Sequence, residues 1–136
     1  MRLQSTVRVV GNDIPALLAR LSPQLAAVVT KAAHDIEAHA KASILSGAKT
    51  GKVYPSGHQA SAPGESPANE FGILAAGIGV IDGAGPLEKR VVSAAAYTRG
   101  LELGTTKVAA RPFMNPALES VRGSFVAAVE FVVSRG

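Results

Sequence analysis

The chain has no cysteine and no tryptophan among its 136 residues, and aromatic residues make up only 4% of it. Without cysteine there is no disulfide, no thiolate metal site and no cysteine nucleophile, and the fold needs no oxidising compartment. Although 47% of the residues are apolar, alanine supplies much of that share and buries far less area than a bulky side chain. The core is therefore expected to be thin, which favours completion by partner subunits.

Long hydrophobic runs are also missing. The most apolar stretches, residues 73–81 and 126–133, are under half of the roughly 20 residues that a membrane helix needs. The first ten residues lack the continuous apolar region of a secretion signal. The net charge is +4, but Lys89-Arg90 is the only adjacent basic pair, so no basic stripe indicates nucleic-acid binding. We expect neither a membrane span nor secretion by that route.

The first part of the chain predicts a strand and then a long helix within a single domain, residues 1–136. Residues 3–10 alternate apolar and polar side chains with the period of a half-buried strand. Apolar residues then recur at steps of three and four for about thirty residues, which predicts an amphipathic helix. Pro23 interrupts this pattern and predicts a kink or a short first helix. Gly47 is expected to end the helix.

The rest of the chain predicts a long loop, a hairpin and a last helix. Residues 46–70 are rich in glycine, proline and serine and hold almost nothing that could form a core. Two strands are predicted at residues 71–81 and 88–96, with a further short element at residues 97–103. A helix is expected to begin near Asn115-Pro116. The fold class is therefore α+β, with a mainly antiparallel sheet packed against an N-terminal and a C-terminal helix.

Several patterns approach known chemical motifs, but none is complete. Residues 47–53, GAKTGKV, depart from a phosphate-binding loop in two ways. Only three residues separate the two glycines, where the motif has four, and Val53 follows the lysine, where the motif has Ser or Thr. His34 and His39 are five residues apart, so they cannot share a metal as residues four apart on a helix could. His58 has no acidic or serine partner at a recognisable nucleophile spacing. We predict no enzyme activity, no metal and no cofactor.

Glu102 is a charge in an apolar context, between Leu101 and Leu103, and Arg111 follows nine residues later. An ion pair between Glu102 and Arg111 would pin the connection between the sheet and the last helix, with Pro112 stiffening the turn. A surface carboxylate on an edge strand is the alternative, and the spacing leaves both open.

Around these residues the sequence resembles a known family. Residues 97–118, YTRGLELGTTKVAARPFMNPAL, are similar to a pattern in small neck or tail-completion proteins of long-tailed DNA bacteriophages, and the earlier segments agree in order. The most specific pieces are Glu-Leu-Gly-Thr and Ala-Arg-Pro-Phe at their mutual spacing. The motif residues in these pieces are Glu102, Gly104, Thr105, Arg111, Pro112 and Phe113.

The resemblance implies a structural virion protein without catalysis, found in the virion and, during assembly, in the host cytoplasm. It implies a homo-oligomeric ring of six subunits at the head-to-tail junction. Such a ring would join the connector or head-completion ring to the tail terminator or tail tube, with genomic DNA passing through its lumen. The alternatives are a tail terminator that caps the tail tube and, more distantly, a DNA-binding accessory protein.

The long loop is the segment that we expect to reach a neighbouring subunit or ring, because it holds too little apolar surface to pack on its own chain. Lys49 and Lys52 would face DNA in the channel, or else serve only to solubilise the loop. The candidate interface residues in the loop are Tyr54, His58, Gln59, Pro63, Glu65 and Pro67.

Overall fold

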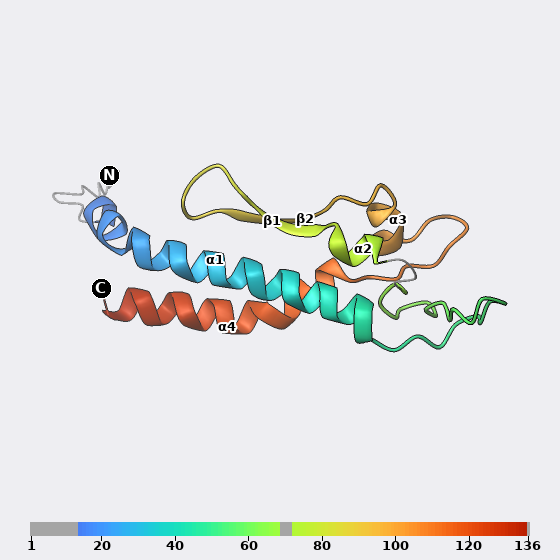
Figure 1. Cartoon of the computed structure of the whole chain (residues 1–136). Helices are drawn as coiled ribbons and strands as arrows, with labels where there is room; N and C mark the ends of the chain where they lie inside the picture. The colour runs from blue at the N-terminus through green and yellow to red at the C-terminus, as the bar shows by residue number, and fades with distance from the viewer. Residues whose placement is uncertain (1–13, 69–71, 136) are drawn as a thin grey trace, which may run out of the picture.

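The computed structural model describes residues 14–68 and 72–135, and the strand predicted at residues 3–10 lies outside this part of the chain. Figure 1 shows an elongated molecule in which two long helices lie side by side and a β-hairpin lies along one of them. The elements in chain order are α1 (Ile14–Ser46), α2 (Ile73–Ala76), β1 (Ile78–Asp82), β2 (Lys89–Ser93), α3 (Thr98–Leu103) and α4 (Met114–Arg135). The predicted α+β class is confirmed.

Helix α1 is a single helix of 33 residues, and its buried side chains follow one stripe from Leu21 to Ile44. Pro23 lies inside it, and Figure 1 shows the first, darkest blue turns at an angle to the rest of the helix. A bend is expected there because proline lacks the N–H that the helix ladder needs. Gly47 follows the last helical residue, as predicted, and a Cβ at this position would collide with the Ser43 carbonyl and the Ser66 hydroxyl.

The predicted hairpin is confirmed, but both strands are shorter than predicted: β1 begins at Ile78, and β2 spans Lys89–Ser93 instead of residues 88–96. Strands β1 and β2 are antiparallel, with Val80 opposite Val91. The strand prediction over residues 71–81 is wrong for residues 73–76, which form the single helical turn α2. Gly72 turns the chain with a positive φ of 74°, and α2 then buries Leu74 against the core. A run this short and apolar has no periodicity that would separate helix from strand.

The core lies where α1, α2, β1 and the start of α4 meet. Ala40 of α1 and Ala117 of α4 are both fully buried, and small side chains of this kind allow two helices to approach closely. Phe113 is the largest fully buried side chain and lies in the same cluster. The buried cluster consists of Ala40, Ile44, Leu74, Ala75, Ile78, Phe113 and Ala117.

Glu102 caps the start of α4, so neither sequence-based alternative is correct. It does not pair with Arg111, and it lies half-buried on helix α3 instead of on an edge strand. Its carboxylate accepts backbone N–H bonds from Phe113 at 2.8 Å, Met114 at 2.9 Å and Asn115 at 2.6 Å. The first N–H groups of a helix have no partner within the helix and carry partial positive charge. The Glu102 carboxylate accepts hydrogen bonds from these N–H groups and compensates their positive charge. It also fixes where α4 begins.

The other residues of the family-like segment shape the chain between α3 and α4. Gly104 has a φ of 78°, and a Cβ there would lie 3.0 Å from the Ala110 nitrogen, so a larger residue would be strained. The Thr105 backbone N–H donates to the Val108 carbonyl at 2.7 Å. Arg111 donates its own N–H to the Leu101 carbonyl at 2.6 Å, and the half-buried Pro112 leads into the buried Phe113.

We predict that Glu102→Ala lowers the free energy of unfolding by about 1–3 kcal/mol, because it leaves several helix N–H groups without their acceptor. Glu130→Ala is the matched control, since Glu130 is an exposed carboxylate on α4, the helix that Glu102 caps. Urea unfolding followed by circular dichroism measures both variants. Equal stability of the two variants would contradict the capping role.

Candidate subunit interface

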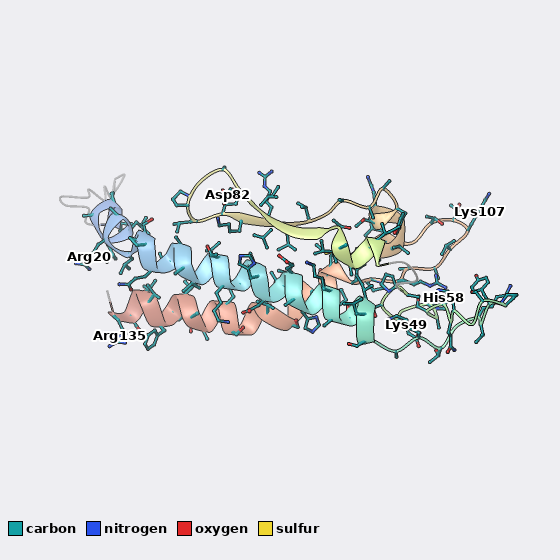
Figure 2. The ribbon with its side chains drawn as sticks, in the orientation of Figure 1. Arg20, Lys49, His58, Asp82, Lys107 and Arg135 are labelled. Carbon is teal, nitrogen blue, oxygen red and sulfur yellow. The ribbon has the colours of Figure 1, made fainter. Side chains whose placement is uncertain are left out.

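The arm (residues 47–68) leaves the end of α1, extends away from the helices and returns to the body, as Figures 1 and 2 show. Its outer part is a small hairpin. Val53 pairs with Gln59 in an isolated antiparallel bridge, and the Tyr54 N–H donates to the His58 carbonyl at 2.8 Å. Gly57 closes the turn with a φ of 87°. The arm is thus a defined projection.

Lys49 fastens one side of the arm to the C-terminal end of α1. Its ammonium donates to the carbonyls of Ser43 at 3.1 Å and Gly47 at 3.2 Å, and to the hydroxyl of Ser66 at 2.8 Å. A positive charge is favourable here because the last helix carbonyls are unpaired and partly negative. Burial lowers the pKa of Lys49, and the nearby Glu65 carboxylate opposes this shift. Its ammonium is therefore engaged within its own chain.

Glu65 closes the base of the arm across its two sides. Its carboxylate accepts bonds from the Thr50 hydroxyl at 2.5 Å, the Thr50 N–H at 2.9 Å and the Ala62 N–H at 2.9 Å. These hydrogen bonds, led by the one from the Thr50 hydroxyl, lower the pKa of Glu65 below its ordinary value.

The base of the arm also contacts the segment that precedes α4. Arg111 donates its Nε–H to the Ser61 carbonyl at 3.2 Å, and the Gly64 N–H donates to the Ala110 carbonyl at 3.0 Å. Ser61 and Pro67 are buried. The expectation that this segment cannot pack on its own chain is thus wrong for its base.

The six candidate interface residues therefore divide into two groups. Glu65 and Pro67 belong to the base that packs on its own chain. The outer hairpin holds three others: Tyr54, His58 and Gln59. Pro63 is exposed but lies in the base, between Ala62, which donates to Glu65, and Gly64, which donates to Ala110.

Two large apolar side chains are exposed at the tip of the arm. Val53 is 60% exposed and Tyr54 is 44% exposed. The Tyr54 ring stacks on His58 with 6.2 Å between ring centroids, and the Lys52 ammonium lies 5.0 Å from the centre of the Tyr54 ring. Successive side chains of a paired strand point to opposite faces. One face of the tip therefore carries Tyr54 with His58 and Lys52, and the other face carries Val53.

An open apolar groove lies between β2 and α4, with α1 as its floor. It has a volume of about 420 Å³, and a second hollow of about 410 Å³ extends it toward the start of α4. At its edge Lys89 pairs with Asp82, and Arg122 pairs with Glu119 at 2.9 Å. The apolar side chains that line it include Val29, Ile36, Val91, Leu118, Phe125 and Val126.

Helix α4 leaves a large part of its apolar face uncovered in the described chain. It buries Ala117 and Val121, whereas Phe131 is 58% exposed and Val133 is 49% exposed. Phe131 and Val133 are two residues apart, so they lie on different sides of the helix. Large exposed apolar side chains beside an apolar groove are a feature of interaction sites. Sequence periodicity predicted the apolar stripe of α4, but it missed the groove, because a stripe does not reveal which residues a neighbouring element will cover.

Other kinds of site are not evident within residues 14–68 and 72–135. No group of three or more His, Asp or Glu side chains could hold a metal there. His34 lies 3.6 Å from Glu37 at the exposed surface of α1. Among the described helices none is long and apolar enough to cross a membrane.

Comparison with known proteins gives no relative: no family model, no curated protein and no solved structure matches this chain. The resemblance of residues 97–118 to phage neck proteins therefore rests on the sequence pattern alone.

We predict that acid loosens the base of the arm. Because the folded pKa of Glu65 lies below its ordinary value of 4.5, its bonds to Thr50 and Ala62 stabilise the arm above pH 4.5 and are lost as the pH falls through the folded pKa. The amide resonances of these two residues should shift together in an NMR titration below pH 4.5. Resonances that do not move until the whole protein unfolds would contradict this.

At neutral pH, Glu65→Gln should speed trypsin cleavage after Lys52 several-fold, because a neutral amide holds the Thr50 and Ala62 groups less strongly. Glu88→Gln is the control, since Glu88 pairs with Arg90 in the hairpin, away from the arm. Equal cleavage rates in the two variants would count against the role of Glu65.

Proposed function

We propose that the chain is a structural subunit of the head-to-tail junction of a long-tailed DNA bacteriophage, assembled as a homo-oligomeric ring of six around the DNA channel. The ring would join the connector or head-completion ring to the tail terminator or tail tube. The protein would act by assembly, in the host cytoplasm and then in the virion, without catalysis or a cofactor.

The observation that carries this proposal is the uncovered apolar surface formed by the groove and α4. The core is small and consists of Phe113, three alanines and three aliphatic residues, while the groove has Phe125 and Val126 in its lining. Apolar area exposed in a single chain is stabilised when a neighbour covers it, at roughly 25 cal/mol per Å². A subunit of an assembly is the protein class that this arrangement supports best.

The family-like residues support the same proposal by what they do in the fold. Glu102 fixes the start of α4, and Gly104 permits the turn that precedes it. Phe113 then enters the core. These residues set the position of α4. A sequence pattern with such a role is expected to recur in proteins of the same fold, even when they have no catalytic activity in common.

We predict that the purified protein forms discrete closed oligomers, seen as rings by negative-stain electron microscopy and as a hexamer by light scattering. Val126→Glu should shift the population to smaller species, because it puts a charge into the apolar groove. Ala127→Glu is the control on the same helix, at an exposed position. A protein that stays monomeric at every concentration would contradict the ring.

Location within the particle needs a separate test. Antibodies against the chain should label the head-to-tail junction of phage particles that contain it. Labelling at the tail tip would contradict the proposal even if rings form in solution. The absence of the protein from purified phage particles would contradict it as well.

A further inference from the structure

We infer that the tip of the arm of one copy inserts into the apolar groove of the next copy. This contact deepens the proposed ring and rests on it: it names the two surfaces through which identical subunits would join. The insertion is carried by Val53 and Tyr54 at the tip and by the groove between β2 and α4.

The arm cannot fill the groove of its own chain. The groove lies over the middle of α1, from Val29 to Ile36, whereas the arm begins after Ser46 and extends away from the helices beyond that end (Figure 1). Ten residues of helix, about 15 Å, separate Ile36 from the start of the arm. The hydrogen bonds of Lys49 hold the arm at that distance. An occupant from the arm must therefore come from another copy.

The chemistry of the tip fits that of the groove. Tyr54 and Val53 are exposed in the single chain, and the groove offers an apolar hollow of about 420 Å³ for such side chains. Tyrosine is one of the residue types that most often dominates binding when it fills a pocket on a partner. Insertion would remove the apolar side chains of the tip and of the groove from water at the same time, which is favourable.

Charge at the two surfaces is complementary as well. The tip carries Lys52, and Glu65, the carboxylate of the arm, is already committed to backbone and hydroxyl donors. At the groove, Asp82 and Glu119 are the acidic partners of the lining cations, and their side chains are 86% and 52% exposed. Lys89 engages only Oδ1 of Asp82, and Arg122 engages Oε1 of Glu119. A carboxylate has about four acceptor sites on its two oxygens, so each can accept the Lys52 ammonium in addition to its present partner.

The contact would join different surfaces of identical chains, which is the arrangement that generates a closed ring when the rotation between copies closes. The fastened base of the arm lowers the entropy lost on insertion, since the tip is already held as a hairpin before it meets a partner.

The first test compares two exposed tyrosines. Tyr54→Ala should weaken oligomerisation about tenfold or more, as expected for a buried anchor residue. Tyr97→Ala should leave it unchanged, because Tyr97 is 52% exposed outside both the arm and the groove. Sedimentation over a concentration series measures both. Equal oligomer stability in the two variants would overturn the inference.

The second test uses the absence of cysteine in the chain, which makes engineered thiols unique. A Ser56→Cys protein mixed with an Arg122→Cys protein should form a heterodimer with a short bismaleimide linker. Replacing the second partner by Arg135→Cys, at the far end of α4 (Figure 2), should abolish it. If the wild-type protein forms rings but the Ser56→Cys and Arg122→Cys proteins do not cross-link, only the inference is overturned. A wild-type protein that forms no oligomer would instead overturn the proposed ring.

Discussion

The rest of the structure depends on the place where α1 and α4 meet. Ala40 and Ala117 are fully buried there, and Phe113 fills the space beside them. Phe113 reaches this site because the Glu102 carboxylate fixes where α4 begins. The hairpin then packs on α1. One capped helix start and one aromatic ring therefore hold together most of a chain whose other core residues are small or aliphatic.

A core this small leaves apolar surface elsewhere, and that surface carries the functional proposal. In the described chain the groove is open, with Phe125 in its lining, and the far half of α4 exposes Phe131 near the end of the helix. The arm extends from the opposite end of the molecule, held by polar contacts at its base and apolar at its tip. A complementary projection and groove on one subunit are what a repeating assembly requires.

The sequence predicts the elements with strong periodicity and misses those that depend on position in space. Helix α1, its end at Gly47 and the hairpin follow from local patterns. The partner of Glu102 does not, because spacing suggests Arg111 whereas the fold brings the start of α4 to the carboxylate. The base of the arm was missed for a similar reason: it is held by hydrogen bonds, and a count of apolar residues does not detect them.

The most direct measurement of the central claim, that neighbours complete this subunit, is the thermal unfolding midpoint as a function of protein concentration. If folding is coupled to assembly, the midpoint should rise by several degrees between about 1 and 100 µM, because mass action stabilises the oligomer. A midpoint that does not change over this range, in a protein that stays monomeric throughout, would contradict the account.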